Sequence, residues 1–270
     1  MGSMMDTIVH LGLVEDEDIQ IEVAALELST LDHPGVDLAP YLMVLSEMEE
    51  RLAAIGGDAV GGTEQAHALS RVIGGDYGFV GDRDGYDAPI NADMIRVIDR
   101  RRGLPVSLSI LYVGLARRLG WPAEPLNTPG HVVVALAPSD VPHVIDPFSG
   151  GQSLTPDQLL AIIRHAAGPA GFPSEIQLEA MTNRMTLTRL LLNQATRAEA
   201  AKDLVRARTL YERITVVAPA DGKGWWELAR LRLADGDLAG ARSSLTSMLE
   251  TVRDREQREL VIAALDAIQT

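Results

Sequence analysis

The sequence predicts an α+β protein that is mostly helical, with a small antiparallel sheet in its first part and an all-α tail. Most apolar residues recur every three or four positions, as on the faces of helices. Only the middle of the chain holds short β-branched segments of the kind that form buried strands. The Gly-Pro-Ala-Gly-Phe-Pro break at 168–173 predicts a boundary between two domains, 6–168 and 174–270.

Three helices are expected before the middle of the chain. Residues 15–31 begin with four acidic residues and continue with apolar ones, which is typical of a helix and its first turn. Residues 42–55 have the clearest helical spacing of this part. Residues 64–74 predict a further short helix, with Gly74 and Gly75 as its stop.

A loop and a basic helix follow. Residues 75–91 are rich in Gly, Asp, Tyr and Pro without periodicity, and a loop of this length is usually functional or a family-specific insertion. Residues 91–102 predict a helix that ends in Arg100, Arg101 and Arg102. These arginines are candidate partner-binding residues. The alternative is a solvated helix end, where cations complement the helix dipole.

The middle of the chain predicts a helix, two strands and another helix. The segment 104–119 has an apolar face, a proline in its first turn and Gly120 as its cap. Residues 131–136 and 143–146 predict strands. A Thr-Pro-Asp-Gln start then predicts a helix over 155–167.

The tail contains a repeat with a period of 34 residues, the tetratricopeptide length. The positions that carry it are Ala207, Tyr211 and Pro219, then Ala241 and Leu245, together with the first-helix sets Leu191, Gln194 and Ala195, and Trp225, Leu228 and Ala229. Small residues let paired helices approach, and large ones fill the groove between them. We expect two repeats and a terminal helix near 251–268, forming either a docking surface or a purely structural appendage.

Two adjacent tryptophans in the tail face different sides of their helix. Trp225 fits the core of the repeat. Trp226 is a candidate partner-binding residue, because an exposed tryptophan is a common anchor at interfaces. Partial burial of Trp226 in the core is the alternative.

Three motifs in the middle of the chain suggest a catalytic constellation. A helix starts near Pro105, a histidine opens the first strand at His131, and an aspartate ends the second strand at Asp146. This order can place a nucleophile at a helix N-terminus, with the histidine as base and the aspartate orienting it. The alternative is structural, since a His–Asp hydrogen bond also holds two strands together.

These motifs resemble a known family. They are Arg-Arg-Gly-Leu-Pro-Val-Ser-Leu, Arg-Arg-Leu-Gly-Trp-Pro, Pro-Gly-His and Ile-Asp-Pro-Phe-Ser-Gly-Gly. Together they resemble the SirB-type bacterial branch of the transglutaminase-like superfamily, whose members carry tetratricopeptide helices. The resemblance implies a papain-like core with a Cys-His-Asp triad, which performs acyl transfer or amide hydrolysis through a thioester.

The resemblance assigns His131 and Asp146 to the triad and places the cysteine position at the start of the helix that begins near Pro105. That position falls on Pro105, Val106 or Ser107, and the chain has no cysteine. We therefore expect a non-catalytic scaffold that binds a protein or peptide partner. The alternative is a serine-dependent hydrolase or acyltransferase that uses Ser107, His131 and Asp146.

Composition excludes several other classes. The net charge of −14 and the pI of about 4.8 disfavour nucleic acid as a partner. No apolar run suits a membrane helix, and the start lacks the pattern of a signal peptide, so we expect a cytoplasmic protein. The sequence contains no metal-ligand spacing and no phosphate loop. We therefore expect neither a metal nor a cofactor. The oligomeric state stays open.

Overall fold

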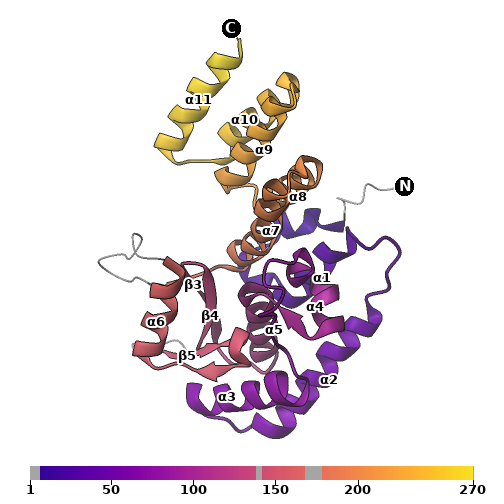
Figure 1. Cartoon of the computed structure of the whole chain (residues 1–270), viewed down its shortest axis with the longest axis vertical. Helices are drawn as coiled ribbons and strands as arrows, with labels where there is room; N and C mark the ends of the chain where they lie inside the picture. Colours follow the sequence, from indigo (N-terminus) through magenta and orange to yellow (C-terminus); the bar gives the residue numbers. More distant parts are fainter. Residues whose placement is uncertain (1–6, 138–141, 168–177, 270) are drawn as a thin grey trace. The chain divides into compact units, whose positions relative to one another are not determined.

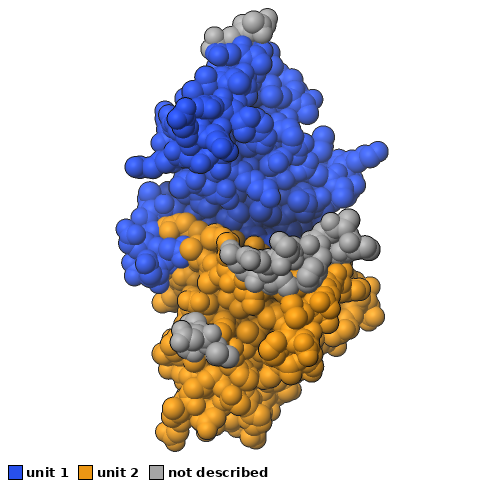
Figure 2. All heavy atoms as spheres, turned by 90° about the vertical axis from the view of Figure 1, so that its left-hand side faces the viewer, with its two compact units in different colours: residues 1–18, 187–270 blue, residues 19–186 orange. Residues whose placement is uncertain are grey.

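A computed structural model describes residues 7–137, 142–167 and 178–269. The chain divides into two compact units (Figure 2). Residues 19–186 form the sheet unit, and residues 1–18 together with 187–270 form the helical unit. The break expected at 168–173 lies outside the described residues, so the division into 6–168 and 174–270 stays a prediction.

The sheet unit combines helices with one antiparallel sheet. Its strands lie in the order β6 (Gln152–Ser153), β5 (His143–Asp146), β4 (His131–Leu136), β3 (Ala123–Thr128) and β7 (Glu179–Ala180). Its helices are α1 (Ile21–Thr30), α2 (Ala39–Gly56), α3 (Gly62–Leu69), α4 (Met94–Arg100), α5 (Pro105–Arg118) and α6 (Pro156–Ala167). The prediction of a mostly helical protein with a small antiparallel sheet is confirmed.

The core of the sheet unit has three layers. Helix α5 packs on one face of β3 and β4, and α6 packs on the other (Figure 1). Val133 and Ala135 of β4 belong to the buried cluster that includes Ile163 of α6. Strand β4 is therefore buried on both faces, which explains why Val132–Leu136 is apolar without alternation.

Strand β3 is the longest of the strands that sequence patterns missed. Its residues, Ala-Glu-Pro-Leu-Asn-Thr, include few of the β-branched and aromatic types that favour strands. Pairing with the strongly apolar β4 holds β3 in the sheet. Pro125 is tolerated because only its carbonyl is used on the edge toward β7, where it accepts from the Met181 N–H at 2.8 Å.

Two expected helix ends are wrong. The helix expected over 15–31 begins only at Ile21, because Asp16–Asp18 form a separate 3-10 turn. The helix expected to stop at Gly74 continues as a π-helix, Ser70–Asp76. A Cβ on Gly74 would lie 2.3 Å from the carbonyl oxygen of Gly150, so this glycine permits a close backbone approach instead of ending the helix.

The basic helix is also shorter than expected. It runs over α4 only, and Arg101 ends it in the left-handed conformation, with φ of 55°. Arg102 and Gly103 then form strand β2 (Arg102–Gly103), which pairs in parallel with β1 (Val80–Gly81). Only β1 of this second, two-stranded sheet lies in the segment 75–91, where a long loop was expected.

Among the described residues, the helical unit consists of two 3-10 turns, Val9–Gly12 and Asp16–Asp18, and a run of helices. These are α7 (Asn183–Ala200), whose first residues belong to the sheet unit, α8 (Leu204–Val217), α9 (Gly222–Ala234), α10 (Leu238–Thr251) and α11 (Arg255–Gln269). Successive helices are joined by side-chain contacts such as Tyr211 to Glu199 and Arg232 to Glu212. The repeat positions Ala207, Tyr211, Ala241 and Leu245 are buried.

Candidate functional site

His131 and Asp146 form a hydrogen-bonded pair at one end of the sheet. His131 opens β4 and Asp146 ends the antiparallel neighbour β5, so both side chains reach the same end. The Nε2 atom of His131 lies 2.9 Å from Oδ1 of Asp146. Asp146 is 3% exposed, and the Nδ1 atom of His131 has no hydrogen-bond partner among the described residues. A paired imidazole with one open nitrogen can accept or donate a hydrogen bond to a bound group.

The carboxylate of Asp146 is held in its charged form. Burial raises the pKa of Asp146. The hydrogen bond and charge of His131, with smaller contributions from Ser149 and the Phe148 N–H, together lower it by more than burial raises it. The net pKa lies below the ordinary value of 3.8. The Phe148 N–H donates to Oδ1 at 3.0 Å, so Asp146 also caps the turn Pro147–Ser149.

Phe148 is the centre of an aromatic cluster beside this pair. Its ring makes edge-on contacts with the rings of His131 at 5.8 Å and Tyr86 at 5.7 Å, between centroids. The guanidinium of Arg83 lies 5.6 Å from the centre of the same ring. Tyr86 and Arg83 come from the segment that the sequence predicted to be a long loop, so this loop does contribute to the candidate site.

Ser107 is engaged in the start of helix α5. It is completely buried, and its hydroxyl oxygen accepts a hydrogen bond from the Leu104 N–H at 2.9 Å. Its single proton faces the carbonyl oxygens of Asn91 at 2.8 Å and Leu104 at 3.0 Å. Among the described contacts, no hydrogen bond joins Ser107 to His131. The hydroxyl therefore serves the helix start and the segment beneath it.

The other residues at the start of α5 offer no nucleophile. Pro105 and Val106 are both buried and apolar. The next hydroxyl along the helix, that of Ser109, is also buried and faces the carbonyl oxygen of Val132 at 3.4 Å. The structure thus brings His131 and Asp146 together and leaves the three candidate positions, 105–107, as part of the core.

Within the basic cluster, Arg100 is bonded to neighbouring side chains, whereas Arg101 and Arg102 have no side-chain hydrogen bond among the described residues. Arg100 donates to Asp82 at 2.6 Å and to Asn91 at 2.8 Å, so it fastens the loop before α4. The hydrogen bond from Arg100 is the main reason why the pKa of Asp82 lies below its ordinary value. Arg101 and Arg102 are exposed.

Arg102 lies at an open depression of about 510 Å³. Strand β1 forms one part of its lining, and Arg83, Asp84 and Phe148 contribute others. Arg83 and Phe148 were not among the residues singled out from the sequence. The signal that could have found them is the position of Arg83 in the long loop and of Phe148 in the Asp-Pro-Phe motif.

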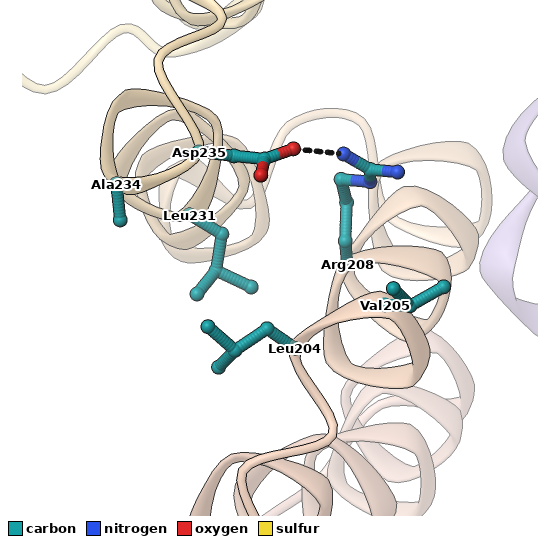
Figure 3. A pocket seen from close by; sticks show the side chains of 6 residues that line it. All are labelled: Leu204, Val205, Arg208, Leu231, Ala234 and Asp235. Atoms are coloured by element: carbon teal, nitrogen blue, oxygen red, sulfur yellow. Dashed lines mark hydrogen bonds and ion pairs between the residues drawn. The ribbon is translucent and has the colours of Figure 1, made fainter.

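The helical unit presents candidate binding residues of its own. Trp226 is 37% exposed, whereas Trp225 is partly buried and donates to the Pro219 carbonyl at 2.9 Å. A pocket of about 80 Å³ lies between α8 and α9, where Leu204 and Leu231 point toward each other (Figure 3). The ion pair between Arg208 and Asp235, 3.1 Å long, spans its rim.

No three histidine, aspartate or glutamate side chains in the part of the chain that the structure describes are placed to share a metal ion. None of the helices described here has both the length and the apolar character that crossing a bilayer requires.

Comparisons with known proteins agree with the fold. Residues 40–192 match the family model of the transglutaminase-like superfamily. A UPF0162 protein of Xylella fastidiosa is 29% identical over 245 residues, which cover 89% of this chain and 86% of that protein. A UPF0162 protein of Vibrio cholerae is 36% identical over 84 residues, or 31% of each chain.

A shorter similarity extends to eukaryotes. F-box only protein 21 of Homo sapiens is 40% identical over 67 residues, which cover 25% of this chain and 11% of that protein. The family match contains the whole candidate site, from Arg83 to Phe148, and spans more than half of the sequence. The chain belongs to the transglutaminase-like superfamily.

Proposed function

We propose that this chain is a non-catalytic member of its superfamily, which acts as a binding or regulatory scaffold for a protein or peptide partner in the cytoplasm. The observation that carries the proposal is the start of helix α5. The superfamily's chemistry needs a nucleophile at that place, and this chain has no cysteine. The hydroxyl of Ser107 is buried and bonded to the backbone of Leu104 and Asn91.

The hydrogen bonds of Ser107 matter because a serine hydroxyl needs a general base at the moment of attack. The base must lie within about 3 Å of the hydroxyl, or be linked to it through one water molecule. The proton of Ser107 is directed at the Asn91 and Leu104 carbonyls. Attack would therefore require breaking contacts that hold the first turn of α5.

The pairing of His131 with Asp146 supports a role in shape and recognition. The pair joins two neighbouring strands, and Asp146 also caps the turn that holds Phe148. Phe148 in turn positions Arg83 at the depression. A catalytic frame without its nucleophile then serves as the wall of a binding surface.

The tetratricopeptide character of the tail is part of the same proposal. Burial of Ala207, Tyr211, Ala241 and Leu245 supports it, because these are the positions at which paired helices approach in such repeats. Repeats of this kind present extended binding surfaces. In this proposal Trp226 and the pocket at Leu204 and Leu231 are candidate contacts for a partner.

The test is turnover by the purified full-length protein. Glutamine-containing peptides with a primary amine as acceptor test acyl transfer, and ammonia release from the same peptides tests amide hydrolysis. We expect no rate above that of the His131→Ala variant in either assay. A rate that disappears in His131→Ala would overturn the proposal, provided that circular dichroism shows that the variant is folded.

A further inference from the structure

We propose that the side chain of Tyr86 is a gate beside the His131–Asp146 pair, and that a ligand reaches the imidazole only when this side chain swings away. The inference concerns access to the candidate site and holds whether or not the pair is catalytic. Three features carry it: the place of the Tyr86 ring, the fixed frame around it and the long hydrogen bond that closes it. All three belong to the sheet unit.

The first feature is the place of Tyr86 next to the turn between β3 and β4. The Tyr86 hydroxyl donates to the carbonyl oxygen of Gly130, the residue directly before His131. The Tyr86 ring also contacts the Phe148 ring edge-on, at 5.7 Å between centroids. Phe148 in turn contacts the His131 ring at 5.8 Å. Tyr86 therefore bridges Gly130 and Phe148, the two residues that flank the imidazole.

The His131 side chain is largely covered at this place. It is 14% exposed, although it opens a strand next to a turn. Its Nε2 atom is bonded to Asp146, so Nδ1, which has no partner among the described residues, is the nitrogen that a ligand can use. A ligand at Nδ1 needs room beside the ring, and one of the aromatic neighbours has to provide it.

The second feature is that Phe148 is fixed. Its ring packs on Gly81 so closely that an added Cβ there would lie 2.4 Å from a ring carbon. Its backbone N–H donates to Oδ1 of Asp146 at 3.0 Å. Displacement of Phe148 would thus disturb both β1 and the carboxylate of the pair, so Tyr86 is the neighbour that can move.

The backbone that carries Tyr86 is also fixed. Arg100 donates to Asp82 at 2.6 Å and to Asn91 at 2.8 Å, so one guanidinium ties both ends of the loop. Inside the loop, the Gly85 N–H donates to Asp82 at 2.9 Å, and the Gly85 carbonyl accepts from the Asn91 side chain at 2.7 Å. Tyr86 follows Gly85 directly. The gate is therefore a rotation of the Tyr86 side chain between rotamers, while the loop stays in place.

The third feature is the length of the bond that closes the gate. The Tyr86 hydroxyl lies 3.3 Å from the Gly130 oxygen, whereas O–H···O hydrogen bonds are most often about 2.7–2.8 Å long. This bond is exposed, so water can replace it when the side chain turns away. Exposed side chains change rotamer within nanoseconds, which makes opening fast compared with ligand binding.

An open gate presents two groups at once. These are the carbonyl oxygen of Gly130 and the Nδ1 atom of His131, next to each other in the chain. A ligand with an N–H or O–H donor takes over the acceptor that the Tyr86 hydroxyl occupies in the closed state. The closed state therefore competes with the ligand, and it lowers the apparent affinity in proportion to the fraction of open molecules.

The experiment measures how fast diethyl pyrocarbonate modifies each histidine of the full chain, by mass spectrometry of its peptides. The reagent acylates an unprotonated imidazole nitrogen, so it reports access to Nδ1 of His131. The exposed His67 of α3 is the internal reference. A minor open state is populated at up to about 10%, so Tyr86→Ala should raise the ratio of His131 to His67 modification at least about tenfold.

Two further variants make the comparison specific. Tyr86→Phe keeps the ring and loses the bond to Gly130, so its ratio should lie between those of the wild type and Tyr86→Ala. The control Tyr41→Ala removes another partly buried tyrosine of the sheet unit, on α2, and should leave the ratio unchanged. An equal ratio in the wild type and Tyr86→Ala would overturn the gate.

Unfolding and loop movement are distinguished by two more readouts. If Tyr86→Ala unfolds, the partly buried His33 also reacts faster. Tyr86→Phe then decides, and a ratio equal to that of the wild type would overturn the gate. Hydrogen exchange of the Gly85 amide should be the same in Tyr86→Phe and the wild type, because that N–H is bonded to Asp82. Faster exchange would mean that the whole loop moves, which contradicts a side-chain gate.

These outcomes are separable from a failure of the proposed function. Turnover that depends on His131 would overturn the non-catalytic role and leave the gate in place. Equal modification of His131 in all variants, with no turnover either, would remove the gate and leave the scaffold role standing.

Discussion

Two regions of the sheet unit would have to cooperate in a catalytic triad, and they use their polar groups differently. At the start of helix α5, the Ser107 hydroxyl is buried and forms its hydrogen bonds with the backbone of Leu104 and Asn91. At the end of the sheet, His131 and Asp146 form a pair whose imidazole keeps one nitrogen without a described partner. The sheet end also borders Phe148, which lines the depression.

The contrast separates folding from recognition. A hydroxyl that caps a helix contributes to stability and cannot also act as a nucleophile without breaking the cap. A His–Asp pair beside an aromatic wall serves stability and still faces a place where a ligand can bind. In the proposed account, the helix start is a structural element, and the sheet end is the part of the candidate site that a partner can contact.

The largest effect is expected at the sheet end. Asp146→Ala should lower the free energy of unfolding by about 3 kcal/mol, because the buried carboxylate accepts hydrogen bonds from His131 and the Phe148 N–H. Urea denaturation followed by circular dichroism measures it. Asp146→Asn keeps an acceptor oxygen and should lose less. Equal stability of Asp146→Ala and the wild type would contradict a structural role for the pair.

Two glycines that pair across β1 and β2 test the packing of the two regions separately. Gly81 faces Gly103 across the parallel strands, and an added Cβ would strike the Phe148 ring at 2.4 Å in one case and the Ser107 Oγ at 2.6 Å in the other. We expect Gly81→Ala and Gly103→Ala each to destabilise the protein by about 2 kcal/mol through overpacking.

Gly75→Ala is the matched control for these glycines. Its Cβ would come no closer than 3.7 Å to the Ser70 carbonyl oxygen. Alanine is favoured over glycine in a helix by about 1 kcal/mol, so this variant should be as stable as the wild type or more so. If Gly81→Ala behaved like Gly75→Ala in denaturation, the close packing of Phe148 on β1 would be disproved.

Much of the sheet unit follows from the sequence, and the exceptions have physical reasons. Helix α5 was predicted from its apolar periodicity, and strands β4 and β5 from their short β-branched runs. Strand β3 was missed because pairing with β4, and not its own residues, determines its conformation. The helix stop at Gly74 was wrong because a long-range contact with Gly150 requires that glycine.

The candidate site was predicted only in part. The order of motifs was enough to bring His131 and Asp146 together, since neighbouring antiparallel strands meet at their ends. It was not enough to show that Ser107 bonds to Asn91, which is 16 positions earlier in the chain. Arg83 and Tyr86 were not predicted as site residues for the same reason, because their contacts with Phe148 join segments far apart in the sequence.

A smaller effect is expected at the helix start. Ser107→Ala should cost about 1 kcal/mol, a typical value for a lost helix cap, because the Leu104 N–H keeps a second acceptor in the Asn91 carbonyl at 3.1 Å. Denaturant midpoints measure the loss. An unchanged midpoint in Ser107→Ala would show that the hydroxyl does not stabilise the helix start.

The smallest effect is a dependence on pH that comes from Asp146. Its pKa is lowered in the folded protein, so its contribution to stability is complete above about pH 4, the unfolded value, and is lost as the pH falls through the lower folded value. Thermal unfolding can be measured between about pH 2 and 7. The stability of Asp146→Asn should decline less steeply toward acid pH than that of the wild type. Identical acid declines would mean that the pair contributes nothing to this dependence.

Labelling with a fluorophosphonate probe, read by mass spectrometry of the intact protein and its peptides, tests the central claim most directly. The account predicts no adduct on Ser107, because the hydroxyl is buried and directed at the carbonyls of Asn91 and Leu104. A stoichiometric adduct on Ser107 that disappears in His131→Ala would show that the serine and the histidine act together, and would contradict the non-catalytic role.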